Sequence, residues 1–372
     1  MNVAILCSGC DSVKRGFETH SRNLFEHLKS ENNDDDYIFF KGDGETKEDE
    51  KIIFRPSRGS FLCIFLSKFR GTNWYWESIF FALGFLLQNL FYRRKFERIL
   101  CIEATVSNVL FKFKFLFPKA KIIWTHGNFI DPEKYPAADL THEVNIENYI
   151  KAKKKLPERN LVLVPHFYSN KNVNSSQNKP VSKKFIKKKY NIKTSKVLLS
   201  VGVIENTQKR MGYIIDEFEK LSDDWSLVFC GRIGDIKIIE KAKNKYGERF
   251  IQVFLPHNLM NEIYSVSDLF VLASLNEGFG LVILEAMSNG CPIVLNNRKL
   301  FHWILKTDRD CINMEHSGNL ANFILEKEKI KGWFKKTGIK NKEIFQSNYT
   351  WNVLEEKYLS MIHTPTNDKN II

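Results

Sequence analysis

The chain has 372 residues and a mass of 43.6 kDa, a length typical of two domains. Hydrophobic residues make up 43% and charged residues 27%, a mixture that excludes a disordered chain and a fibrous protein. Lysine and arginine number 56 against 43 acidic residues, and the resulting formal charge of +13 favours an anionic partner, such as nucleotide phosphates, an anionic membrane or a nucleic acid.

Short strand-like runs alternate with helical patterns along most of the chain. The predicted strands are 3–7, 37–40, 52–54, 99–102, 121–125 and 161–164, followed by 197–201, 227–230, 251–254, 269–273 and 292–295. The clearest predicted helices between them are 17–28, 79–91, 212–221, 236–245 and 282–289. This alternation predicts an α/β protein with parallel sheets that carry helices on both faces.

A polar segment at 168–184, with Pro180 inside it, separates two α/β halves of similar size. We therefore predict two domains, 1–175 and 185–350, each a Rossmann-like fold, that face each other across a cleft. Folds of this kind bind ligands at the carboxyl ends of their strands, so the site is expected there.

Cysteine usage indicates a reducing compartment, because seven cysteines are scattered without regular spacing. The longest apolar stretch, 79–91, is shorter than the roughly 20 residues that cross a bilayer. We expect a cytoplasmic protein.

The most specific segment of the chain is 274–294, where the predicted strand 269–273 leads through a glycine turn into a helix and then into another strand. A glycine turn that opens a helix lets backbone amides approach an anion, which the helix dipole also favours. Glu277 lies on that turn and Glu285 lies in the helix. Two carboxylates so placed could bind the hydroxyls of a sugar and a ribose, whereas the alternative is that they only stabilise the helix N-terminus.

This segment resembles the donor-site motif of retaining glycosyltransferases of the GT-B fold, in particular glycosyltransferase family 4. The resemblance implies that Glu277 orients the transferred sugar and Glu285 binds the ribose. It also implies that sugar hydroxyls or phosphate are bound by the turn amides around Phe279, Gly280 and Leu281.

The loop after the strand at 197–201 is similar to the family loop that holds the donor diphosphate. Lys209 matches the family lysine, while Val203 stands where the family has arginine, and Arg210 is the candidate for the second positive charge. Two cations beside a leaving diphosphate would stabilise the charge that develops as the glycosidic bond breaks.

In the first half, His126 lies at a predicted strand end before Gly127, like the family histidine that lines the cleft beside the transferred sugar. The alternative is a structural histidine. Gly16 lies in a loop similar to the family's glycine loop near the donor phosphate and acceptor, with Arg15 in place of one glycine. The last segment, 351–372, resembles the family helix that packs back on the first domain.

The resemblance implies a metal-independent, retaining glycosyltransferase that moves a hexose-type sugar from a nucleotide-diphosphate sugar to a glycan or lipid-linked acceptor in cell-surface polysaccharide biosynthesis. No cofactor is expected, and the leaving diphosphate is expected to take the acceptor proton. Two alternatives stay open: a non-catalytic GT-B subunit of a glycan assembly complex, which the substitutions at Arg15 and Val203 allow, and a sugar-nucleotide epimerase.

Other patterns point to competing functions. The pair Cys7 and Cys10 has the spacing of redox and metal motifs, and 34–36 and 308–310 contain the D-x-D pattern of metal-dependent glycosyltransferases. We interpret both D-x-D segments as solvated turns. No nucleic-acid module accompanies the basic clusters at 92–95, 151–155 and 183–189. The apolar helix at 74–91, followed by the basic cluster 92–95, suggests instead a peripheral contact with an anionic membrane surface, or else a core helix below a solvated face.

Overall fold

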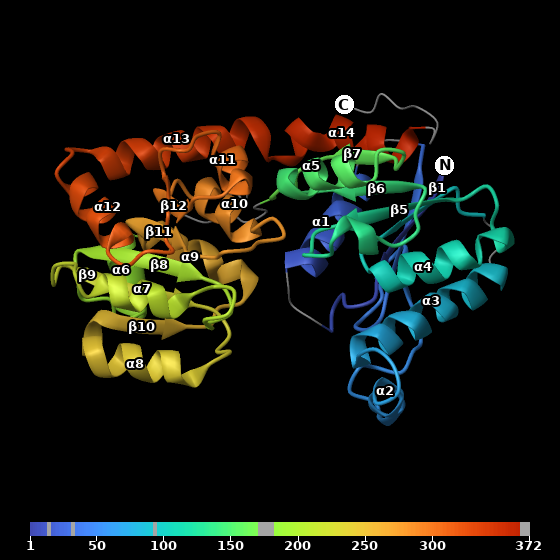
Figure 1. The fold of residues 1–372 in the computed structure, drawn as a ribbon, viewed down its shortest axis with the longest axis horizontal. Helices are drawn as coiled ribbons and strands as arrows, with labels where there is room; N and C mark the ends of the chain where they lie inside the picture. Colours follow the sequence, from blue (N-terminus) through green and yellow to red (C-terminus); the bar gives the residue numbers. More distant parts are fainter. Residues whose placement is uncertain (13–15, 31–33, 92–94, 170–181, 365–372) are drawn as a thin grey trace. The chain divides into compact units, whose positions relative to one another are not determined.

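The computed structural model describes residues 1–12, 16–30, 34–91, 95–169 and 182–364. It divides into two compact units, with unit 1 formed by Met1–His166 and Leu354–Ile372 and unit 2 by Phe167–Val353 (Figure 1). Several predicted features fall at least partly outside the described residues: Arg15, most of the basic cluster at 92–95, the greater part of the polar segment at 168–184, and the end of the segment 351–372.

Unit 1 is built on a seven-stranded parallel sheet with the order β3-β2-β1-β4-β5-β6-β7. Its strands are β1 (Asn2–Cys7), β2 (Asp36–Lys41), β3 (Glu50–Ile52), β4 (Arg98–Cys101), β5 (Lys121–His126), β6 (Leu140–Glu143) and β7 (Leu161–Leu163). Buried aliphatic and aromatic residues fill the middle strands, as expected for a sheet covered on both faces.

The helices of unit 1 are α1 (Gly16–Ser30), α2 (Phe61–Ser67), α3 (Asn73–Phe91), α4 (Ala104–Lys112), α5 (Ile146–Lys155) and most of α14 (Trp351–His363). One face of the sheet packs on α3 and α4 through a core that includes Phe40, Phe85 and Trp124. The other face packs on α1, where the rings of Phe25 and Phe39 stack at 5.2 Å.

Helix α14 is fixed to unit 1 by polar contacts as well as by packing. The Tyr358 hydroxyl donates to the Pro165 carbonyl at 3.0 Å, and the Arg98 guanidinium donates to the Ile362 carbonyl at 2.6 Å. The expected return of the last helix to the first domain is therefore confirmed for the described part of that helix.

Unit 2 contains a six-stranded parallel sheet with the order β10-β9-β8-β11-β12-β13. Its strands are β8 (Lys196–Val201), β9 (Trp225–Cys230), β10 (Phe250–Val253), β11 (Leu269–Leu272), β12 (Ile293–Asn296) and β13 (Cys311–Ile312). The α/β class and the two parallel-sheet, Rossmann-like domains predicted from the sequence are confirmed.

Helices cover both faces of this sheet. They are α6 (Lys183–Lys189), α7 (Met211–Phe218), α8 (Ile236–Tyr246), α9 (Met260–Val266), α10 (Leu281–Ser288), α11 (Lys299–Leu305), α12 (Asn319–Glu328) and α13 (Trp333–Asn348). Residues of α7, α8 and α12 form the core on one face, while Tyr264 of α9 contacts Phe270 of β11 on the other.

Three strand predictions need correction. Strand β3 ends at Ile52, two residues before the predicted end, and Phe54 is 93% exposed. Strands β6 and β13 were not predicted, because β6 reads Leu-Thr-His-Glu and β13 has only two residues, so neither shows an apolar pattern. Within the described residues, no helix is long and apolar enough to cross a membrane.

Candidate functional site

Two of the predicted donor-site residues meet at the carboxyl edge of the sheet in unit 2. Lys209 lies in the loop after β8 and Glu277 in the loop after β11, and these two strands are neighbours. The Lys209 Nζ donates to Glu277 Oε1 in a close ion pair, with the two side chains only 14% and 7% exposed. The structure thus joins residues 68 positions apart in the sequence at the edge where such folds bind ligands.

The position of Lys209 is set by a turn that Glu205 organises. The Glu205 carboxylate accepts hydrogen bonds from the backbone amides of Thr207 at 2.7 Å, Gln208 at 3.0 Å and Lys209 at 2.6 Å. Burial opposes ionisation, but a hydrogen bond from the Thr207 hydroxyl, together with these backbone hydrogen bonds, lowers the pKa of Glu205. The sequence analysis assigned Glu205 no role, although an acidic residue followed by Asn-Thr just after a strand is a typical turn-forming pattern.

Glycines at two places let the backbone form this edge. A Cβ at Gly231, after β9, would lie 1.8 Å from the Gly202 carbonyl oxygen, so only glycine allows the two loops to approach. Gly280 has a φ of +90° and precedes the first residue of α10. Because α10 begins at Leu281, its first amides and its dipole point to the turn that carries Glu277.

Phe279 has a structural part in the same turn. Its side chain is 3% exposed and contacts the rings of Trp303 and Tyr349 at 6.3 and 6.5 Å. The ring therefore anchors the turn to the core of unit 2, and only the backbone of Phe279 can serve a ligand.

Glu285, in α10, is a largely buried carboxylate. Its Oε2 accepts a hydrogen bond of 2.8 Å from the Tyr264 hydroxyl, and its Oε1 lies 4.0 Å from Nε2 of His257. Burial raises the pKa of Glu285, while Tyr264 and His257 act in the opposite direction. The hydrogen bond from Tyr264 holds the side chain in one orientation. Because the side chain is 11% exposed, part of it still reaches the surface.

Arg210 does not join the Lys209–Glu277 pair. It has a left-handed backbone, with φ 53°, and its guanidinium donates to the Met314 carbonyl at 2.7 Å and lies 4.8 Å from the ring centre of Tyr213. Two other arginines lie at this edge of the sheet and were missed by sequence reasoning.

The first of these is Arg298, which donates to the carbonyl of Leu275 and to Oδ1 of Asn276 and so supports the turn before Glu277. The second is Arg232, in the loop after β9, whose carbonyl accepts the Ile204 amide at 2.9 Å. The Arg232 side chain is exposed and forms no hydrogen bond or ion pair within the part of the chain that the structure describes. No sequence pattern distinguishes these two arginines from other surface arginines.

In unit 1, His126 ends β5 and is completely buried. Its Nδ1 lies 2.9 Å from Oε2 of Glu143 and 2.8 Å from the Tyr135 hydroxyl, and Trp124 stacks on the ring at 4.9 Å. An ionised carboxylate only accepts, so the contact with Glu143 places a proton on Nδ1 of His126. Nε2 of the same ring has no hydrogen-bond partner among the described residues.

Gly16 and His126 are brought close together within unit 1. Gly16 is the first residue of α1, and the ring of the next residue, Phe17, lies where a Cβ at Gly127 would be, only 1.5 Å from that position. The start of α1 therefore packs on the backbone that follows β5. The two sequence predictions fall in one region, whose present packing buries His126.

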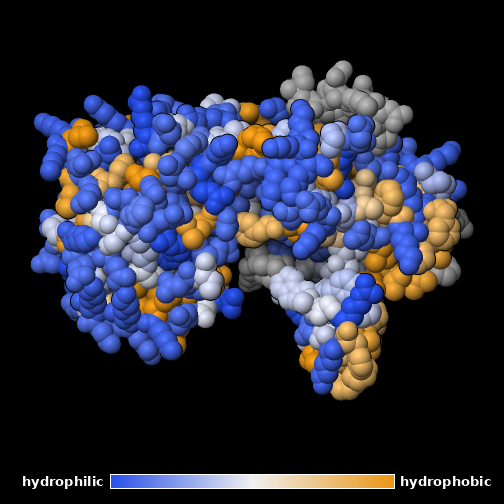
Figure 2. Space-filling view, viewed as in Figure 1, coloured by the Kyte–Doolittle hydropathy of each residue, from blue (hydrophilic) through white to orange (hydrophobic). Residues whose placement is uncertain are grey.

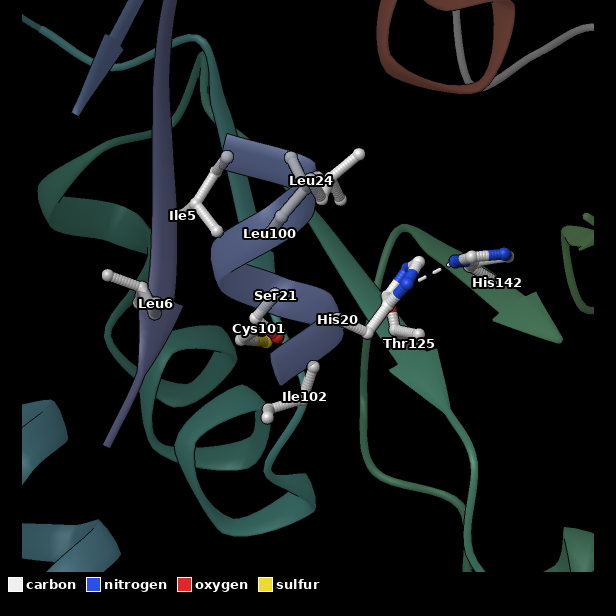
Figure 3. Close-up of a pocket in the computed structure, with 10 residues that line it drawn as sticks. All are labelled: Ile5, Leu6, His20, Ser21, Leu24, Leu100, Cys101, Ile102, Thr125 and His142. Atoms are coloured by element: carbon white, nitrogen blue, oxygen red, sulfur yellow. Dashed lines mark hydrogen bonds between the residues drawn. The ribbon is translucent and has the colours of Figure 1, made fainter. Parts of the chain in front are cut away.

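A second buried polar cluster in unit 1 involves the neighbouring histidines. The rings of His20 and His166 lie 3.8 Å apart. Figure 3 shows His142 beside Thr125, whose hydroxyl it contacts at 3.1 Å. Burial lowers the pKa of His142 to about 4 and that of His166 well below its ordinary value. The adjoining cavity, about 10 Å³, has room for a water molecule and none for a sugar.

The competing motifs lie elsewhere. Cys7 and Cys10 are buried free thiols. The D-x-D segments lie at the amino ends of their strands, 34–36 at the start of β2 in unit 1 and 308–310 just before β13 in unit 2, whereas Glu277 follows the carboxyl end of β11. Among the described residues, no group of three or more His, Cys, Asp or Glu side chains is arranged to hold a metal ion.

Comparisons with known proteins give a family match within unit 2. Residues 182–310 match the family model of glycosyl transferases group 1, and this range includes Lys209, Glu277 and Glu285. No curated protein sequence matches the chain.

Solved structures match nearly the whole chain. Sucrose-phosphate synthase from Thermosynechococcus elongatus is 15% identical with a TM-score of 0.74, covering 96% of this chain and 98% of that one. HepE from Anabaena, in complex with UDP and glucose, is 12% identical with a TM-score of 0.74 and coverages of 97% and 98%. WaaG, a glycosyltransferase involved in lipopolysaccharide biosynthesis, is 12% identical with a TM-score of 0.72 and coverages of 98% and 100%. The chain thus has the GT-B fold, and the family match at 182–310 supports a glycosyltransferase.

Proposed function

We propose that this protein is a retaining glycosyltransferase of family 4 that transfers a hexose-type sugar from a nucleotide-diphosphate sugar to a hydroxyl of a glycan or lipid-linked acceptor. The observation that carries the proposal is the Lys209–Glu277 ion pair at the glycine turn before α10, inside the segment that matches glycosyl transferases group 1. We assign the donor to unit 2 and the acceptor to unit 1.

The donor diphosphate lies against Lys209 and the first amides of α10. Lys209 carries a positive charge, and the first amides of α10 carry a partial positive charge. Both are held in place before the ligand binds, because the Glu205 turn fixes Lys209 and the buried Phe279 ring fixes the start of α10. Arg232 supplies the second cation, because it lies at the same edge and Arg210 is already bonded to the Met314 carbonyl. Glu285 accepts hydrogen bonds from the ribose hydroxyls.

Transfer with retention needs no side-chain nucleophile. The bond between the anomeric carbon and the leaving phosphate oxygen breaks, the acceptor oxygen forms its bond on the same face, and its proton passes to the departing diphosphate. Glu277, shared between Lys209 and a sugar hydroxyl, orients the sugar during this step. We further assign to Nε2 of His126, in unit 1, a hydrogen bond from a sugar hydroxyl.

We further propose that the reaction proceeds without a metal ion and belongs to cell-surface polysaccharide biosynthesis, a pathway class that the likeness to WaaG supports. The cytoplasmic location and the absence of a nucleic-acid partner stay predictions. A non-catalytic binding subunit and a sugar-nucleotide epimerase are the alternatives.

The deciding experiment measures nucleotide release from a panel of UDP-, GDP- and ADP-sugars, with and without glycan or lipid-linked acceptors. A transferase releases one nucleotide diphosphate in an acceptor-dependent reaction. An epimerase changes the sugar while it stays attached to the nucleotide, and a binding subunit binds the donor without turnover. Either of the last two results would overturn the proposal.

A further inference from the structure

An apolar ridge is exposed on unit 1 at the hairpin of α2 and α3. We define the α2 ridge as six large apolar side chains, all at least 42% exposed: Phe61, Leu62, Ile64, Phe65, Phe69 and Trp74. In α2 itself, the one buried residue is Cys63. Figure 2 shows hydrophobic surface gathered over α2, which projects from one end of unit 1 in Figure 1.

The aromatic residues of the α2 ridge are continuous. Phe61 and Phe65 stack with ring centres 6.0 Å apart, and Phe65 meets Phe69 edge-on at 5.1 Å. Single exposed apolar residues are common on protein surfaces, but a contiguous row of aromatic side chains marks an interaction surface.

The charges that the segment 56–91, which carries the α2 ridge, presents to solvent have one sign. Lys68 and Arg70 are exposed, and the Arg58 guanidinium lies 4.1 Å from the ring centre of Trp74. The one carboxylate between residues 56 and 91 is Glu77, whose side chain is 3% exposed and paired with arginines. The surface of this hairpin is therefore apolar and cationic without an exposed acid.

We propose that the α2 ridge docks unit 1 on the surface of an anionic lipid bilayer. Aromatic and leucine side chains enter the boundary between headgroups and acyl chains, and Lys68 and Arg70 contact the anionic headgroups. Charge complementarity selects this occupant, because a cationic apolar ridge without carboxylates suits an anionic interface.

This surface differs from the one expected from the sequence, which centred on the helix at 74–91. In α3, Phe81, Phe85 and Leu86 are buried in the core of unit 1, so most of that helix is structural. Leu87 and Leu90 remain exposed and extend the apolar surface along α3. The inference goes beyond the proposed glycosyl transfer and does not depend on it.

The test is sedimentation of the full chain with vesicles of phosphatidylcholine, with or without phosphatidylglycerol. The wild type is expected to bind the anionic vesicles and to dissociate as salt rises. Phe61→Asp/Phe65→Asp should lower the partition coefficient by about a hundredfold, and Lys68→Glu/Arg70→Glu by at least about thirtyfold. Phe254→Asp, at a 68% exposed phenylalanine of unit 2, is the matched control and should bind like the wild type.

Each other outcome overturns the proposal. Absent binding, or equal binding to neutral and anionic vesicles, excludes an anionic bilayer as the occupant. A wild-type dimer in analytical ultracentrifugation that Phe61→Asp/Phe65→Asp converts to monomer would make the α2 ridge a protein interface. Nucleotide binding, which we assign to unit 2, is measured on the same variants, so that loss of docking and loss of donor binding are distinguished.

Discussion

Replacing Lys209 by methionine tests the core of the proposed site, because the substitution keeps most of the side-chain volume and removes only the charge. The Glu277 side chain, 7% exposed, is then left without its cation. A nearly buried carboxylate that loses its partner destabilises the fold by about 2 kcal/mol, which lowers the melting temperature by about 4–8 °C for a domain of this size. Loss of the diphosphate contact should cost about 3 kcal/mol more at the transition state, or about 150-fold in turnover.

The assay combines thermal unfolding, calorimetric titration of the nucleotide diphosphate and single-turnover nucleotide release. The double variant Lys209→Met/Glu277→Gln removes the unpaired charge, so it should regain stability without regaining turnover. If the double variant recovers turnover, or if Lys209→Met alone binds and reacts like the wild type, the ion pair is structural and the assignment of the site fails. Arg232→Ala and Arg210→Ala provide a comparison, with the larger loss of nucleotide affinity expected for Arg232.

Four further predictions follow from the described contacts. Glu285→Ala should weaken nucleotide binding about thirtyfold through loss of charge-assisted hydrogen bonds, whereas Tyr264→Phe, which keeps the carboxylate, should have a much smaller effect in the same titration. His126→Gln, whose amide can still donate to Glu143, should keep the melting temperature and lower turnover about a hundredfold; lower stability with normal specific activity would make His126 purely structural. Excess EDTA should leave the initial rate unchanged, and a loss restored by Mg²⁺ or Mn²⁺ would indicate a metal-dependent mechanism. His142 has a pKa of about 4 in the folded protein, below the ordinary value of 6.5, so the unfolded chain binds its proton first as pH falls. This histidine should therefore cost about 2 kcal/mol of stability between pH 7.5 and pH 5, and denaturant unfolding of His142→Gln should show a weaker dependence on pH.

Much of the fold could be predicted from local pattern. Most strands of both sheets show apolar runs bounded by turn residues, and the helices between them carry an apolar face, so the α/β class and the parallel sheets followed from the sequence. The turn before α10 could also be predicted, because glycine is the residue that most readily adopts a positive φ. In the structure Gly280 has a φ of +90°.

Polar residues whose hydrogen-bond partners lie far away in the sequence could not be assigned to a strand from local pattern. In β6, His142 bonds to the Thr125 hydroxyl and to the Val164 carbonyl, and Glu143 bonds to His126. Each partner lies on a neighbouring strand or in the segment that follows one. The polar side chains of β6 therefore find their hydrogen-bond partners only after the sheet has formed, and the sequence alone does not identify β6 as a strand.

The sequence by itself determined that Lys209 and Glu277 follow predicted strands, and its resemblance to a known family made these two residues and Glu285, in the next helix, candidates for one site. The tertiary structure decided how their neighbours are used. Arg210 adjoins Lys209 in the sequence, yet its side chain bonds to Met314, 104 residues away, while Arg232 reaches the same sheet edge from another loop. Periodicity and spacing fix backbone placement over a few residues, but the direction and burial of a side chain depend on the packing of segments far apart in the chain.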